Sequence, residues 1–183
     1  MEPTNAAQKV VGMQLPRDGL WTALALIAVL NVIMLTLLQV ATPAPVAFEE
    51  QVFALSPFSY VAIIGIFLVL FVFSTYHVGK MFGGAGTLEA TLAIIVWFQS
   101  ISLTLEAVQL LLVLISPAIA SIFGLLSLGA LIWCFVNFVN VLHQYENLGK
   151  SIVTIILALL GTALVAGIIL TIFGIAPTAG GMA

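Results

Sequence analysis

Long apolar stretches separated by short polar breaks are the main pattern of this sequence. They cover residues 20–40, 57–77, 88–115, 118–142 and 151–173. Each is close to or above the roughly 20 residues that a helix needs to cross about 30 Å of hydrocarbon. Prolines and glycines stand at several of the breaks, where they end helices. The pattern therefore predicts an all-α integral membrane protein with a bundle of five transmembrane helices.

These stretches leave little of the chain outside the membrane. We expect a short amino-terminal segment over residues 1–19, one five-span transmembrane domain over 20–176, and a flexible carboxyl-terminal tail over 177–183. The stretch over 88–115 is about 40 Å long as a helix, so it should tilt, bend or protrude.

Two segments outside the spans are candidates for helices that lie on the membrane surface. In the loop after the first span, Phe48, Val52 and Leu55 share one helical face, which is typical of a short interfacial helix. Between Ala7 and Leu15 the apolar residues do not follow one clean helical face, so this segment is the weaker candidate for such a helix.

Composition and charge exclude a soluble protein and a nucleic-acid partner. Hydrophobic residues make up 63% of the chain and charged residues 6%, so the lipid bilayer must supply much of the solvent. The net charge is −3, and no basic patch stands outside the apolar stretches. We therefore expect the lipid bilayer as a partner and no nucleic acid.

The four basic residues predict the orientation of the chain. Lys9 and Arg17 precede the first span, Lys80 follows the second, and Lys150 follows the fourth. These positions lie on one side of a five-span protein, and Lys and Arg beside short loops are retained in the cytoplasm. The amino terminus is therefore expected in the cytoplasm and the carboxyl terminus outside.

Polar residues within the third span form a stripe along one helical face. Gln99, Ser102, Glu106 and Gln109 follow one another at spacings of three, four and three residues. An acidic side chain in mid-span costs roughly 3 kcal/mol, so we expect Glu106 to be protonated or hydrogen-bonded. The stripe could line a path for protons or a substrate. Hydrogen bonding between helices, worth about 1 kcal/mol per contact, is the interpretation we favour.

Three residues in other spans lie at a depth where they could contact this stripe. They are Asn31, Ser127 and Thr162, and the sequence does not choose among them. Small residues four apart, Ala120 with Gly124 and Ala163 with Gly167, permit close helix packing or self-association.

The remaining polar residues predict no catalytic, cofactor or metal site. Asn137, Asn140 and Gln144 lie near the cytoplasmic end of the fourth span, where solvation explains them. A metal site of His77, His143 and Glu146 is disfavoured, because two histidines so far apart give a weak signal. The single cysteine, Cys134, is expected to be a small core residue. Without a nucleophile beside a base in an aqueous site, we do not expect an enzyme.

The most distinctive local sequence is HVGKMFGGAGTLEATL, over residues 77–92. Met81 follows Lys80 where a phosphate-binding loop needs Ser or Thr, so nucleotide binding is not predicted. The glycines favour a tight turn, and Thr87 is placed to cap the next helix. Residues 143–150 repeat part of this pattern weakly, with a histidine followed by glycine and lysine.

This segment resembles the Yip family of membrane proteins that interact with Ypt and Rab GTPases. Gly83, Gly84, Gly86 and Thr87 match the glycine turn of the family, and the resemblance extends from Phe58 to Ile175. It implies a non-enzymatic, five-span protein that organises membranes or binds partners. Eukaryotic relatives do so with small GTPases at Golgi and endoplasmic reticulum vesicles.

One departure from the family limits what the resemblance implies. The relatives have a substantial cytosolic amino-terminal region, whereas only residues 1–19 precede the first span here, so small-GTPase binding is not expected. The chain looks like a compact prokaryotic-type member of a bacterial cytoplasmic membrane.

Three functions therefore follow from the sequence. The first is a scaffold for membrane organisation or trafficking that binds other membrane proteins or itself. The second is an accessory subunit of a larger membrane complex. The third is a small transporter or proton pathway that uses the stripe containing Glu106.

Overall fold

The computed structural model describes residues 2–13, 15–41 and 56–172, and within them it contains helices and no strands. The helices are α1 (Pro3–Gly12), α2 (Arg17–Ala41), α4 (Pro57–Met81), α5 (Leu88–Ile115), α6 (Pro117–His143) and α7 (Leu148–Ile172). The last five are each long and apolar enough to cross a membrane. This confirms the predicted all-α fold with five membrane-length helices. The expected interfacial helix at Phe48 and the tail over residues 177–183 lie outside the described residues.

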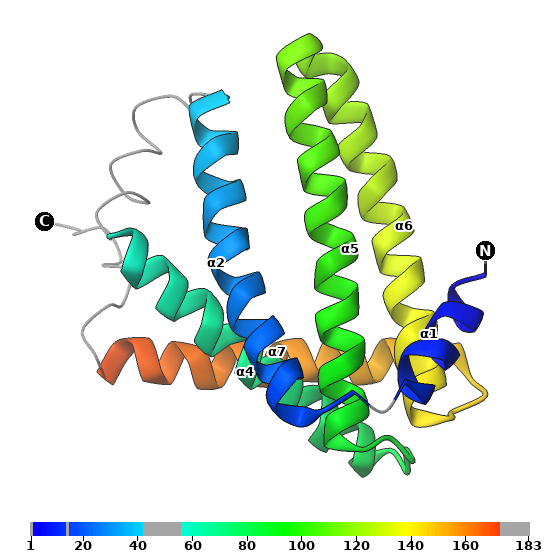
Figure 1. Ribbon diagram of the computed structural model, residues 1–183. Coiled ribbons are helices and arrows are strands. Elements are labelled where there is room, and N and C mark those ends of the chain that lie inside the picture. The colour runs from blue at the N-terminus through cyan, green and yellow to red at the C-terminus, as the bar shows by residue number, and fades with distance from the viewer. Residues whose placement is uncertain (1, 14, 42–55, 173–183) are drawn as a thin grey trace, which may run out of the picture.

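Local sequence sets the ends of these helices. Ser56 precedes α4, and its side-chain oxygen accepts a hydrogen bond of 3.2 Å from the Ser59 backbone N–H. Ser116 is extended and separates α5 from α6, and Pro117 occupies the first turn of α6. This one-residue break folds α5 and α6 into a long hairpin (Figure 1).

The amino-terminal segment forms a helix that the sequence pattern did not predict. It covers Pro3–Gly12, overlaps the weaker of the two candidate surface helices, packs against α6 and α5, and buries Ala7 and Val10 completely or nearly so. Tertiary packing supplies most of a short helix's stability, and two apolar residues on one face are enough for that contact.

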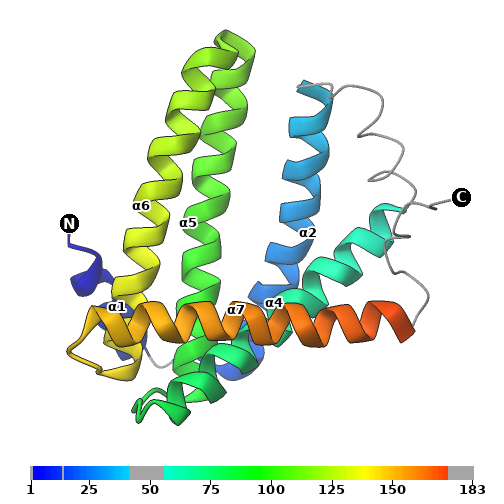
Figure 2. The same ribbon diagram turned by 180° about the vertical axis from the view of Figure 1, so that it is seen from behind.

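The long helices are arranged openly. The α5–α6 hairpin and α2 rise side by side from one end of the molecule, and α2 packs against α5 and α4 (Figure 1). Seen from behind, α7 runs crosswise beneath the hairpin and packs along α4 (Figure 2).

Small side chains on α7 explain its close contact with α4. The buried residues of α7 are Ser151, Thr154, Ala158 and Thr162, which lie on one helical face. The opposite face is apolar and exposed, with Leu160, Leu164 and Ile168 each more than half accessible. It is a surface suited to lipid.

The core lies at the end of the molecule where the basic residues are found. It combines the first half of α2, the second half of α4, the first turns of α5 and the last turns of α6. Phe138, Val139, Ile94 and Val72 are fully buried there. By contrast, Leu114 and Leu125, near the α5–α6 turn, are 71% and 72% exposed. The far half of the hairpin therefore packs against little of the chain.

Candidate functional site

A buried histidine joins the two turns at the basic end of the molecule. His143, the last residue of α6, is 1% exposed and fits against three glycines of the α4–α5 segment. A Cβ at Gly84 would lie 2.5 Å from His143 Nδ1, and one at Gly86 would lie 2.9 Å from it. A Cβ at Gly79 would also collide with the ring. We call Gly79, Gly84, Gly86, His143 and Tyr145 the glycine–histidine cluster.

Hydrogen bonds hold this cluster together. The Tyr145 hydroxyl donates to the Gly79 carbonyl oxygen at 2.9 Å and lies 3.1 Å from the Thr154 hydroxyl of α7. The Ala85 backbone N–H donates to the His143 carbonyl oxygen at 3.0 Å. Burial raises the pKa of the Tyr145 phenol, and the hydrogen bond with Thr154 opposes part of that rise. Tyr145 therefore stays protonated at neutral pH and links α4, α6 and α7.

The glycine turn predicted from the sequence is part of this structure. Gly83 has a φ of 78°, which is readily adopted by glycine, and its N–H donates to the Lys80 carbonyl oxygen at 3.0 Å. Thr87 caps α5 as expected, since its side-chain oxygen accepts a hydrogen bond from the Ala90 N–H at 3.2 Å. Gly84 and Gly86 serve the contact with His143 instead, because only glycine leaves room for the ring.

The polar residues at the end of α6 have structural partners. Asn140 Oδ1 accepts hydrogen bonds from the Asn147 N–H at 3.2 Å and the Ser151 hydroxyl at 3.3 Å, which ties the α6–α7 turn to α6. The Asn137 amide donates to the Trp133 carbonyl oxygen at 2.8 Å. Solvation therefore does not account for these asparagines, contrary to the interpretation from sequence.

The two histidines lie in different environments. His77 is partly turned to the surface, with Nδ1 2.8 Å from the Phe73 carbonyl oxygen of its own helix. His143 is enclosed by glycines. Within residues 2–13, 15–41 and 56–172, no three metal-ligating side chains come together, His77, His143 and Glu146 included.

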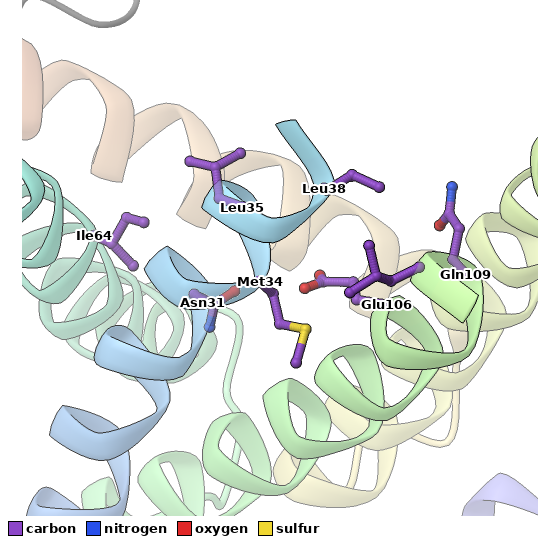
Figure 3. Close-up of a pocket in the computed structure, with 8 residues that line it drawn as sticks. Asn31, Met34, Leu35, Leu38, Ile64, Glu106 and Gln109 are labelled. Atoms are coloured by element: carbon purple, nitrogen blue, oxygen red, sulfur yellow. The ribbon is translucent and has the colours of Figure 1, made fainter. Parts of the chain in front are cut away.

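A second candidate region is a cleft between α2 and α5. It has a volume of about 290 Å³. Figure 3 shows the Glu106 carboxyl directed from α5 toward α2. The cleft is lined by Asn31, Met34, Leu35, Leu38, Ile64, Glu106, Gln109 and Leu110. We call this the α2–α5 cleft.

The four side chains of the predicted polar stripe differ in how much of each is exposed. Ser102 is buried, Gln99 and Gln109 are half-buried, and Glu106 is exposed in the cleft. Gln109 also packs against α6, where a Cβ at Gly124 would lie 2.8 Å from its amide nitrogen. The stripe therefore does not act as one surface.

Of the three residues expected near the stripe, Asn31 shares the cleft with Glu106. Its amide nitrogen donates to the Ile27 carbonyl oxygen at 2.9 Å. Thr162 instead donates to the Ala158 carbonyl oxygen of α7 at 2.8 Å. Ser127, in the middle of α6, does not line the cleft.

Sequence reasoning did not find Tyr145 and Thr154. Both bond across elements, and Tyr145 is 66 residues from Gly79 along the chain. One signal in the sequence could have pointed to this region, namely the histidine, glycine and lysine of residues 77–80 that recur in residues 143–150. In the structure these two segments are neighbours in space.

Comparison with models of protein families shows to which family the chain belongs. The family model of the Yip1 domain matches residues 1–174. The chain belongs to the Yip1 domain family. The matched residues of the Yip1 domain include both the glycine–histidine cluster and the α2–α5 cleft, and they begin before α1 rather than at Phe58. No curated protein and no solved structure matched the chain.

Proposed function

We propose that this Yip1-domain protein is a non-enzymatic membrane protein that organises membranes by binding other membrane proteins or further copies of itself. The observation that carries the proposal is a groove of about 560 Å³ between α1 and α6. It is lined by Thr4, Gln8, Val11, Gly12, Asn140, Val141, Gln144 and Glu146. A groove lined by amide groups, a carboxylate and the apolar side chains of Val11 and Val141 suits a polypeptide segment with free backbone donors.

The orientation that we propose places this groove in the cytoplasm. Lys9 and Arg17 lie on α1 and at the start of α2, and Lys80 and Lys150 lie beside the two turns joined by the glycine–histidine cluster. The four cations therefore gather at one end, as the positive-inside rule requires of a cytoplasmic face. We propose a bacterial cytoplasmic membrane as the location. Labelling of single cysteines at Glu146 and Ser116 in intact cells tests the orientation, and Ser116 alone should react.

Partner capture tests the scaffold function. We expect purification in mild detergent, followed by crosslinking, to recover a stable membrane-protein partner or an oligomer. Gln8→Arg, exposed in the groove, should abolish recovery. Asn5→Arg is the matched control, because Asn5 is exposed on α1 but borders a different pocket. Failure to recover any stable partner would contradict the proposal, and a fixed stoichiometry with one larger complex would indicate an accessory subunit.

A small transporter or proton pathway is the second candidate, because Glu106 opens into the α2–α5 cleft. Flux into liposomes that contain the purified protein tests it directly. Glu106→Gln should reduce the flux if the carboxyl carries protons or a substrate. Equal flux in the variant and the parent would eliminate this function.

A further inference from the structure

The Glu106 carboxyl lacks a counter-charge. Among the described residues it forms no hydrogen bond or ion pair, although it is exposed in the α2–α5 cleft. It lies eighteen residues after Leu88, about 27 Å along α5 at roughly 1.5 Å per residue. That depth places it in the hydrocarbon, where an unpaired charge is costly.

Among the described residues, no Lys or Arg lies at this depth. Lys80 lies in the last turn of α4 and Arg17 begins α2, while Lys9 and Lys150 lie on α1 and in the first turn of α7. All four are at the basic end of the molecule, opposite the end toward which Glu106 lies. Residues 42–55 and 173–183 contain no Lys, Arg or His. A cation that pairs with Glu106 must therefore come from outside the chain.

The polar residues that line the cleft are Asn31, Glu106 and Gln109, and the Gln109 amide nitrogen lies against Gly124 of α6, which leaves mainly acceptors toward the cleft. The Asn31 amide nitrogen is engaged by the Ile27 carbonyl oxygen. Its side-chain oxygen is left to accept a further bond, and an ionised carboxylate only accepts. Acceptors without a neighbouring cation attract an ammonium group and repel phosphate or a fatty-acid carboxylate.

The rest of the lining is aliphatic. Met34, Leu35 and Ile64 form walls suited to an alkyl chain, and Leu35 is 37% exposed at the rim. The volume of about 290 Å³ is at the lower limit for ligand pockets. It can hold a head group and the first carbons of a chain, while the remainder extends into lipid.

We propose that the α2–α5 cleft binds the ammonium group of an amphiphile, with Glu106 as its counter-ion and the Asn31 side-chain oxygen as a second acceptor. The source of this chemistry is either the head group of an aminophospholipid or a free long-chain amine. The inference goes beyond the scaffold function and does not depend on it. The cleft is lined by residues of α2, α4 and α5, whereas the groove is lined by residues of α1, the end of α6 and the turn after it.

The first experiment measures binding of tetradecylamine to the purified protein by native mass spectrometry, with tetradecanol as the uncharged probe. Glu106→Gln keeps the size of the side chain and removes the charge. It should weaken amine binding about tenfold or more, the range of a charge-assisted hydrogen bond. Glu89→Gln is the matched control, because Glu89 is exposed in the first turn of the same helix and does not line the cleft. The Glu89→Gln variant should bind tetradecylamine as tightly as the parent does.

Circular dichroism and gel filtration establish that the Glu106 variant is folded, so that loss of binding reports on the cleft. Equal amine binding by parent and Glu106→Gln would overturn the proposal, as would tetradecanol binding as tightly as the amine. Loss of partner capture in Gln8→Arg leaves this measurement unaffected, so the two proposals fail separately.

The second experiment distinguishes the sources. A photoreactive phosphatidylethanolamine is incorporated into nanodiscs of phosphatidylcholine, and crosslinked peptides are mapped. Crosslinks near Met34 that tetradecylamine displaces would assign a lipid head group. Amine binding without such crosslinks would assign a free amine. Neither amine binding nor crosslinks would reject the site.

Discussion

Tyr145 of the glycine–histidine cluster and Glu106 of the α2–α5 cleft have opposite surroundings. In the cluster, the buried Tyr145 hydroxyl bonds to Gly79 of α4 and to Thr154 of α7, while the two ring nitrogens of His143 are buried without a hydrogen-bond partner among the described residues. In the cleft, Glu106 is exposed at hydrocarbon depth and bonds to none of the described residues. A buried polar group that is hydrogen-bonded stabilises a fold, whereas an unpaired carboxyl that opens into a cleft at membrane depth is a candidate for binding.

The difference separates the part of the molecule that holds the helices from the part that is free to bind. The core is concentrated around the cluster, where α1, α4, α5, α6 and α7 meet. The cleft lies farther along α2 and α5, where these helices have fewer buried neighbours. Substitutions in the cluster should therefore change stability, and substitutions in the cleft should change binding.

The largest expected effect is that of Gly79→Ala. The new Cβ would collide with the His143 ring, which is enclosed on its other sides and cannot move away freely. We expect a loss of about 3 kcal/mol in the free energy of unfolding, typical of overpacking, measured as a lower midpoint of thermal unfolding in mild detergent. Gly129→Ala is the control, because nothing lies within 4 Å of its Cβ position. It should be neutral or slightly stabilising.

A double variant sharpens this prediction. Removing the ring with His143→Ala in the Gly79→Ala background should recover part of the loss, since the collision disappears. If the two substitutions instead destabilise additively, the cluster is not the close packing described above.

Tyr145→Phe should have the next largest effect. It removes the hydroxyl that donates to the Gly79 carbonyl oxygen and leaves that oxygen buried without this bond. We expect the free energy of unfolding to fall by about 1–2 kcal/mol, and thermal unfolding in mild detergent measures this change. Tyr76→Phe is the control, because no bond of its hydroxyl is seen within the described part of the chain. Equal effects of the two substitutions would mean that Tyr145 acts through packing alone.

The difference between parent and Tyr145→Phe should also depend on pH. Burial raises the pKa of Tyr145, so the folded state holds the phenolic proton more tightly than the unfolded state does. The contribution is present below the ordinary tyrosine pKa of about 10 and is lost as the pH rises through the higher folded-state value.

The sequence was most informative about elements that depend on nearest neighbours. Apolar length predicted the five long helices, and Thr87 was recognised as a cap because capping involves residues three apart. The helix α1 was not predicted, although Pro3–Gly12 is amphipathic and packs Ala7 and Val10 inward, because the segment weighed from the sequence began at Ala7 and extended past the end of the helix.

Interactions between distant residues explain the other differences. Ala120 is buried and Gln109 packs on Gly124, whereas Ala163 is exposed and Gly167 has nothing near its Cβ position. The two pairs have similar spacing, so only the placement of the neighbouring helices separates them. For the same reason the polar stripe on α5 revealed Glu106 but not the cleft in which it lies.

Thr87→Ala should have a smaller effect than either change in the cluster. The threonine oxygen accepts one hydrogen bond from the Ala90 N–H at the start of α5, and the alanine cannot replace it. We expect the free energy of unfolding, measured by thermal unfolding, to fall by about 1 kcal/mol. Thr104→Ala is the comparison, because its exposed hydroxyl bonds only to the Ser100 carbonyl oxygen within α5. A Thr87 effect no larger than that of Thr104 would argue against the cap as an anchor of the glycine turn.

Glu106→Gln should have the smallest effect on stability. No bond to the described residues is lost, and a neutral amide is easier to place in hydrocarbon than a carboxylate. We expect the free energy of unfolding to stay within about 0.5 kcal/mol of that of the parent, and the helical content measured by circular dichroism to be unchanged. A loss as large as that of Tyr145→Phe would contradict this expectation and show that Glu106 supports the fold. The contrast between the cluster and the cleft would then be one of position along the helices rather than of role.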